Sequence, residues 1–99
     1  MTDFWILSQN EKILKKIDCL EVYYTGDSYV IKDGFTALAT YPTEQRAMEV
    51  LKEVDAIKSW KYMAQTDYKR FKDAANTAFT SEGILDLFSK MNTYEFPKE

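Results

Sequence analysis

The stretch YPTEQRAMEVLKEV, residues 41–54, marks the point where the chain changes from an extended to a helical pattern. Before it, apolar and polar residues alternate; within it, apolar residues recur every three or four positions, at Ala47, Val50 and Leu51. Thr43 is a good helix N-cap, because its hydroxyl can accept a hydrogen bond from a free amide of the first turn. The stretch therefore predicts a sheet on its N-terminal side and helices on its C-terminal side.

The preceding residues predict an antiparallel meander. Alternation and short turns define three strands, at residues 19–24, 29–32 and 35–41. Asp33-Gly34 is the stronger turn signal, because both residues tolerate the positive φ of a tight hairpin turn. Residues 4–7 form an apolar run of strand length, which we expect to join this sheet. The pattern of residues 10–18 fits either a helical turn or a short strand.

The residues after Pro42 predict two or three helices. No Gly or Pro occurs between Pro42 and Gly83, so helix can continue, bent or broken, to Phe79. Ser81 is expected to cap a further helix, and residues 94–96 can form a closing strand. The expected inward residues of these helices are Trp60, Ala64, Phe71, Ala75, Ala78, Ile84, Leu87, Phe88 and Met91.

Together these elements predict one α+β domain with helices on one sheet face. It has an N-terminal antiparallel β-meander of three to four strands, then two to three helices and a short C-terminal strand. Its expected parts are a β-rich segment 1–41, a helical segment 43–91 and a closing strand and tail 92–99.

Composition restricts the function. The chain has 99 residues and a net charge of -3, which disfavours direct nucleic-acid binding and binding to anionic membranes. It has no histidine, which excludes a zinc site and the histidine-dependent triads and dyads. Cys19 is the only cysteine and is expected in the core, and the chain reads as cytoplasmic, with no signal peptide or membrane span. We expect no enzyme activity, no cofactor and no metal.

Three short segments resemble a group of small, functionally undefined proteins of Gram-positive bacteria and their phages. The matching residues are Trp5, Ile6, Ser8, Gln9, Tyr41, Thr43, Arg46, Ala47, Val50, Leu51, Glu95, Phe96 and Pro97. The resemblance covers about a third of the chain, and residues 58–92 look like an insertion between the first helix and the closing strand. It implies a phage or mobile-element setting, with the host cytoplasm as location, and implies nothing about catalysis.

Arg46 is the leading candidate for a ligand site. Acidic residues are preferred in the first turn of a helix, and a guanidinium beside free amides there can hold a phosphate or carboxylate. Thr43 at the helix start belongs to the same candidate site, Ser8 and Gln9 could add donors, and Tyr41 and Tyr23 could stack on a base. The alternatives are an Arg46 paired with Glu44 or Glu49 or lying over an aromatic ring, and tyrosines that pack within the sheet.

Two further features are candidates in the helical segment. Lys58, Lys61, Lys69 and Lys72 fall on one side of a continuous helix, and could track a phosphate backbone, bind an acidic partner or form a solvated face. Asp67 projects onto the apolar side of the same helix, which predicts a buried carboxylate paired with Arg70 or a tyrosine.

These observations favour a non-enzymatic phage or prophage counter-defence protein that sequesters a small anionic ligand, such as a nucleotide. Such a site would form between subunits, which makes a homo-oligomer an option. The alternative is an inhibitor that binds a host nuclease or nucleic-acid-binding effector through an acidic or aromatic surface on the helical insertion.

Overall fold

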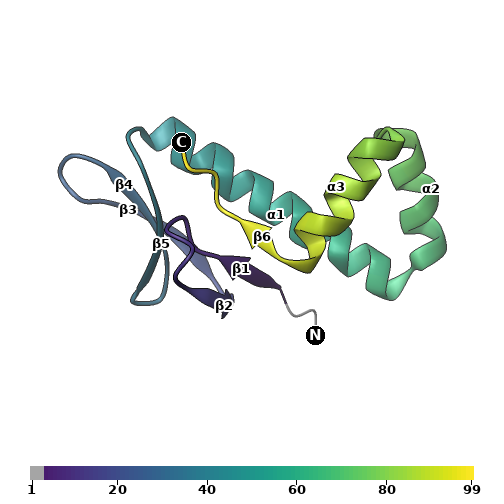
Figure 1. Cartoon of the computed structure of the whole chain (residues 1–99), viewed down its shortest axis with the longest axis horizontal. Coiled ribbons are helices and arrows are strands. Elements are labelled where there is room, and N and C mark those ends of the chain that lie inside the picture. The colour runs from purple at the N-terminus through teal and green to yellow at the C-terminus, as the bar shows by residue number, and fades with distance from the viewer. Residues whose placement is uncertain (1–3) are drawn as a thin grey trace.

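The computed structural model describes residues 4–99, which form six strands and three helices (Figure 1). The strands are β1 (Trp5–Leu7), β2 (Leu14–Lys16), β3 (Leu20–Tyr24), β4 (Tyr29–Asp33), β5 (Thr36–Tyr41) and β6 (Tyr94–Glu95). The helices are α1 (Glu44–Thr66), α2 (Tyr68–Ala78) and α3 (Ser81–Asn92). This arrangement is the expected α+β fold, and the ambiguous residues 10–18 contain a strand.

The strands form two three-stranded sheets. The order β3-β4-β5 is the predicted antiparallel meander, and the second sheet has the order β2-β1-β6. The expectation that the N-terminal strand joins the meander is wrong. Instead, β1 pairs antiparallel with β2 and parallel with β6, with Ile6 opposite Tyr94.

The β4–β5 turn lies one residue later than expected. Asp33 pairs with Thr36, so the two central residues are Gly34 and Phe35. Only Gly34 has a positive φ, of 60°, which fits a turn with glycine at its first central position. Phe35 at the tip is fully exposed.

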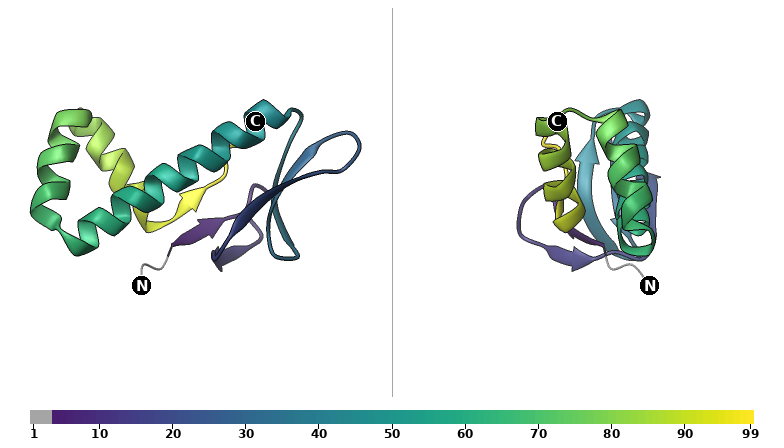
Figure 2. Two further views of the ribbon diagram at one scale, coloured as in Figure 1. Left: turned by 180° about the vertical axis from the view of Figure 1, so that it is seen from behind. Right: turned by 90° about the vertical axis from the view of Figure 1, so that its right-hand side faces the viewer.

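Helix α1 begins where the hydrophobic period changes. The Thr43 hydroxyl accepts a hydrogen bond from the Arg46 amide at 3.1 Å, as expected of an N-cap. Ala47, Val50 and Val54 are buried, and the helix contacts all three strands of the meander. Its C-terminal part runs away from the meander and carries α2 and α3 at the other end of a molecule measuring 45 × 26 × 19 Å (Figure 2).

The helical segment breaks at Asp67, and the predicted burial of this carboxylate is wrong. Asp67 is exposed and ends α1, while its side chain accepts a hydrogen bond from the Arg70 amide at 3.2 Å and so caps α2. The bond comes from the main-chain amide of Arg70 and not from its guanidinium, so it is a helix cap at the surface and not the predicted charge pairing. The cap of α3 is Thr80, one residue before the expected Ser81.

We call residues 58–92 the helical lobe. Trp60 packs edge-on against Phe71 and Phe79, with ring centroids 5.9 and 5.4 Å apart, and Phe71 in turn contacts Phe88 at 5.7 Å. Two expected inward residues lie outside, since Ala78 is exposed and Phe88 is 42% exposed. None of the helices in residues 4–99 is long and apolar enough to cross a membrane.

Candidate functional site

The Arg46 guanidinium is held within the chain. Its Nε donates to the main-chain oxygen of Glu99 at 2.8 Å, one terminal nitrogen lies 3.4 Å from the Glu49 carboxylate, and the group lies 5.7 Å from the centre of the Tyr41 ring. These are the alternatives that the sequence left open for Arg46, an acid partner and an aromatic ring. The helix start therefore does not present an unoccupied guanidinium.

Ser8 and Gln9 also use their polar groups within the fold. The buried Ser8 hydroxyl donates to Asn10 at 2.6 Å and accepts from the Ile13 amide at 3.1 Å. The Gln9 side chain accepts from the Thr40 amide at 2.9 Å and donates to the main-chain oxygens of Pro97 and Lys98 at 3.0 and 3.1 Å. Because these groups are bonded to the chain, their expected role as ligand donors has no local support.

Tyr41 completes this arrangement. Its buried hydroxyl donates to the Pro97 oxygen at 2.8 Å, and burial raises the pKa of Tyr41 to about 12, so the donor proton is present at neutral pH. Gln9, Tyr41 and Arg46 thus hold residues 97–99, which we call the tail. The three segments that carry the resemblance meet here, in contacts that connect distant parts of the chain.

Tyr23 is not part of this cluster. It lies on β3, whereas Tyr41 ends β5 at the opposite edge of the meander. The Tyr23 hydroxyl donates to Glu21, which raises the pKa of the phenol, and the Lys32 ammonium lies 5.3 Å from its ring centre. Tyr23 is 46% exposed.

The four candidate lysines do not form one face. Lys58 and Lys61 belong to α1, while Lys69 and Lys72 belong to α2, on the other side of the break at Asp67. Lys61 lies 5.8 Å from the centre of the Phe4 ring. The predicted stripe required an unbroken helix, so it is wrong as a continuous surface.

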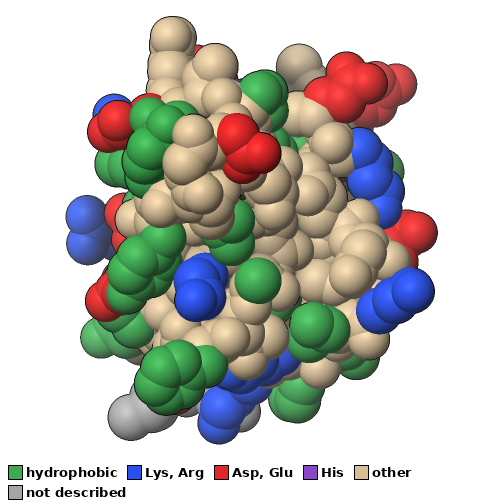
Figure 3. Space-filling view, turned by 90° about the vertical axis from the view of Figure 1, so that its left-hand side faces the viewer, with side chains coloured by type: hydrophobic (Ala, Val, Ile, Leu, Met, Phe, Trp, Pro, Cys, Tyr) green, Lys and Arg blue, Asp and Glu red, His purple; other side chains and the backbone are tan. Residues whose placement is uncertain are grey.

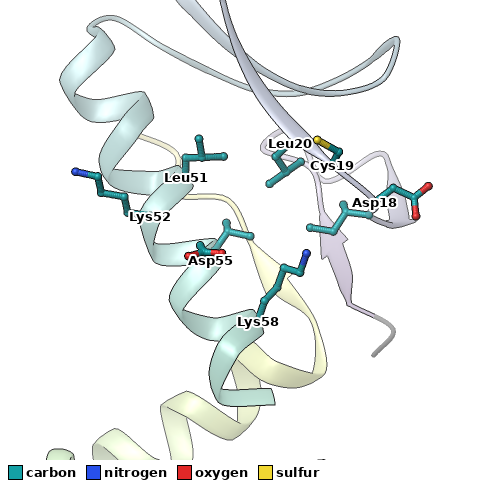
Figure 4. Close-up of a pocket in the computed structure, with 9 residues that line it drawn as sticks. Asp18, Cys19, Leu20, Leu51, Lys52, Asp55 and Lys58 are labelled. Atoms are coloured by element: carbon teal, nitrogen blue, oxygen red, sulfur yellow. The ribbon is translucent and has the colours of Figure 1, made fainter. Parts of the chain in front are cut away.

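A cleft of about 400 Å³ lies between α1 and the start of β3, and we call it the α1–β3 cleft. Its lining residues are Ile17, Asp18, Cys19, Leu20, Leu51, Lys52, Val54, Asp55 and Lys58. Ile17, Leu20, Leu51 and Val54 are its apolar lining residues, with Leu20 on the β3 side and Leu51 on the α1 side. Figure 4 shows the Lys58 ammonium directed toward the segment 18–20, while Lys52 and Asp18 point away from the cleft.

Sequence reasoning missed this cleft, although it named several of its residues, among them Cys19, Leu51 and Lys58. Cys19 was expected in the core, and that is wrong: its thiol is exposed at the cleft. Its amide donates to Asp33 at 3.3 Å, which ties this wall to β4. The sequence feature that could have indicated the cleft was Leu51, an apolar residue on the helix stripe. In the structure Leu51 is only half-buried, because it lines the cleft.

Within residues 4–99, no three acidic, cysteine or histidine side chains are grouped closely enough to hold a metal ion. No protein-family model, curated protein or solved structure matches the chain. The functional argument therefore depends on the geometry of the chain alone.

Proposed function

We propose that this is a non-enzymatic binding protein that captures a small anionic ligand, of the nucleotide type, in the α1–β3 cleft. The observation that carries the proposal is the combination of an apolar lining with Lys58, an ammonium directed into the cleft. Among the described residues no carboxylate lies within 4 Å of the Lys58 nitrogen, so the charge is open to a ligand.

The chemistry of the cleft suits a planar or apolar body that carries one anionic group. Leu20 and Leu51 approach from opposite walls and could hold a base between them, while Lys58 takes the anion. The volume is within the range of small-molecule sites. The sequence resemblance adds a phage setting, in which stoichiometric capture of a host nucleotide would act as counter-defence. The lack of histidine supports binding over catalysis.

The test is thermal unfolding with a panel of nucleotides. A ligand present at about 100 times its dissociation constant stabilises the folded state by about 2.7 kcal/mol, which raises the melting temperature by about 10 °C in a domain of this size. We expect this rise in the native protein and its loss in Lys58→Glu. Lys72→Glu is the matched control, because Lys72 is an exposed helix lysine outside the cleft.

Two results would remove the proposal. One is the absence of a shift with any member of the panel. The other is an equal shift in the Lys58→Glu and Lys72→Glu variants, which would place the ligand elsewhere.

A second candidate function is protein binding through the helical lobe. Tyr68 and Leu85 are 59% and 71% exposed, and Tyr68 is connected to Phe88 through the ring of Phe71. The lobe contains six Lys or Arg and four Asp or Glu, a net charge of +2, which favours an acidic partner and argues against an imitation of nucleic acid. A protein captured by the native chain, but lost with Leu85→Glu, would support this candidate.

A further inference from the structure

The two sheets have four edge strands, β2, β6, β3 and β5. Three of them are protected against pairing with another strand, and β3 is not. Unpaired edge strands tend to join other strands, and proteins commonly block them with lysines, short length or covering segments. The outer edge of β5 is covered by Gln9, whose amide donates to Leu38 and whose side chain accepts from Thr40. The edge strand β2 carries Lys15 and Lys16, and β6 is two residues long.

The edge strand β3 has none of these features. Its sequence LEVYY contains no lysine, proline or glycine, and is rich in residues that favour strands. Within residues 4–99 no strand pairs with its outer edge. The outer edge of its five residues is therefore unpaired, and Glu21 is the one charged residue in this strand.

The register of the meander determines which main-chain groups face outward. In an antiparallel pair, bonded and non-bonded residue pairs alternate. The Thr25 amide donates to the Ser28 oxygen at 2.9 Å, so the next bonded pairs along the ladder are Tyr23–Val30 and Glu21–Lys32. The remaining residues of β3 direct their N–H and C=O groups away from β4; these are Leu20, Val22 and Tyr24.

The opposite edge of the sheet confirms this alternation. Thr40 is paired with Val30, a residue that bonds toward β3, so the Thr40 amide should point outward from β5. It does, because it donates to the Gln9 side chain at 2.9 Å.

We propose that β3 pairs antiparallel with β3 of a second copy of this chain, with a twofold axis at Val22, to form a continuous six-stranded sheet. In this register Val22 lies opposite Val22, and Leu20 lies opposite Tyr24. Each residue with outward main-chain groups in one copy therefore faces such a residue in the other copy, and each facing pair exchanges two hydrogen bonds.

The side chains match in the same register. Leu20 opposite Tyr24 is an aliphatic–aromatic pair, and Glu21 lies opposite Tyr23, so no two like charges face each other. Figure 3 views the end of the molecule that carries the β3–β4 hairpin and shows basic, acidic and hydrophobic side chains intermixed, without a field of one sign to repel a second copy. A foreign strand would need outward groups and side chains that match by chance, whereas a second copy supplies both.

The pairing also completes the α1–β3 cleft. Leu20 and Val22 pack toward the core, on the side of α1, and Tyr24 shares their face by alternation. Tyr24 of the second copy would therefore lie beside Leu20 at the mouth of the cleft. This accounts for an exposed tyrosine, 64% accessible, at that position of the strand.

The experiment is sedimentation velocity over a range of protein concentrations. We expect a reversible dimer in the native protein. Tyr23→Glu places one carboxylate of each copy directly opposite Glu21 of the other copy. The two like-charged pairs, one on each side of the twofold axis, should raise the dimer dissociation constant about tenfold. Tyr23→Lys removes the same ring but pairs with Glu21, and should keep the dissociation constant within about threefold of the native value.

Amide hydrogen exchange locates the interface by residue. The amides of Leu20, Val22 and Tyr24 should become protected as the protein concentration rises, while those of Glu21 and Tyr23 are protected throughout. A monomer at every concentration, with fast exchange at those three amides, would overturn the proposal. A dimer that Tyr23→Glu leaves intact would also overturn it. Neither readout involves a ligand, so failure here is distinguishable from failure of the nucleotide site.

Discussion

Asp33 is the buried charge that positions the wall of the cleft. It is 5% exposed, its carboxylate lies 3.0 Å from the Lys15 ammonium, and it accepts the Cys19 amide. Burial by itself would raise the pKa of Asp33, but the Lys15 ammonium together with the Cys19 and Asp18 amides lowers it below the usual value. Asp33 thus connects β4 to both β2 and the start of β3.

This lowered pKa predicts how stability depends on pH. An unfolded aspartate titrates near pH 3.9, so the stabilisation by Asp33 is fully present above that value and is lost as pH falls through the lower pKa of the folded state. We expect Asp33→Asn to reduce the free energy of unfolding by about 1–2 kcal/mol at neutral pH, with the difference closing toward pH 2. Urea denaturation at several pH values measures this.

Asp27→Asn, in the exposed β3–β4 turn, is the control and should show little difference at any pH. A penalty for Asp33→Asn that stays constant from neutral to acid pH would mean that the charge of Asp33 contributes nothing.

At the scale of elements, α2 depends on its cap. The α1–α2 break contains no Gly or Pro, and the Asp67 side chain accepts a hydrogen bond from the first turn of α2. We expect Asp67→Ala to reduce the free energy of unfolding by about 1 kcal/mol and Asp67→Asn by only a few tenths, since asparagine caps equally well. Urea denaturation, followed by circular dichroism, measures both.

Asp73→Ala, a substitution at an exposed position within α2, is the control and should change the free energy of unfolding by less than about 0.5 kcal/mol. A similar loss in the alanine and asparagine variants would exclude a capping role.

The elements also show why the sequence predicts some features and misses others. The change of period after Tyr41 and the N-cap at Thr43 depend on neighbouring residues, and both are confirmed. The apolar period assigned Asp67 to an inward position, because periodicity assumes a continuous helix. The competing signal was also local: aspartate is a preferred N-cap, and its side chain competes with helix continuation.

At the scale of the whole molecule, the missed features are contacts between distant residues. The parallel pairing of Ile6 with Tyr94 and the bonds from Gln9 to the tail span almost the whole chain. Such contacts leave no periodic pattern, since one glutamine looks like any other polar residue. The residues of the resemblance include Ile6, Gln9 and Pro97 but not Tyr94, and they indicated no role for these contacts. The position of Arg46 suggested a ligand where the structure places the tail.

The tail contacts predict an energetic coupling across the molecule. Gln9 and Tyr41 both donate to the Pro97 oxygen, from a loop after β1 and from the end of β5. Gln9→Ala and Tyr41→Phe should each reduce the free energy of unfolding by about 1–2 kcal/mol. Tyr41→Phe removes one partly buried hydrogen bond, and Gln9→Ala removes one partly buried bond together with two exposed ones. Once either substitution has released the tail, adding the second substitution should reduce the free energy of unfolding by less than it does alone.

The double variant should therefore be more stable than the sum predicts, by at least about 0.5 kcal/mol. As a control, Gln9→Ala combined with Asp67→Ala should be additive, because Asp67 caps α2 in the helical lobe and shares no partner with Gln9. Urea denaturation of the native protein, the three single variants and the two double variants measures both double-mutant cycles. If Gln9→Ala and Tyr41→Phe are additive, the two side chains stabilise their own strands independently. Coupling would mean that Gln9, Tyr41 and the tail form a single structural unit.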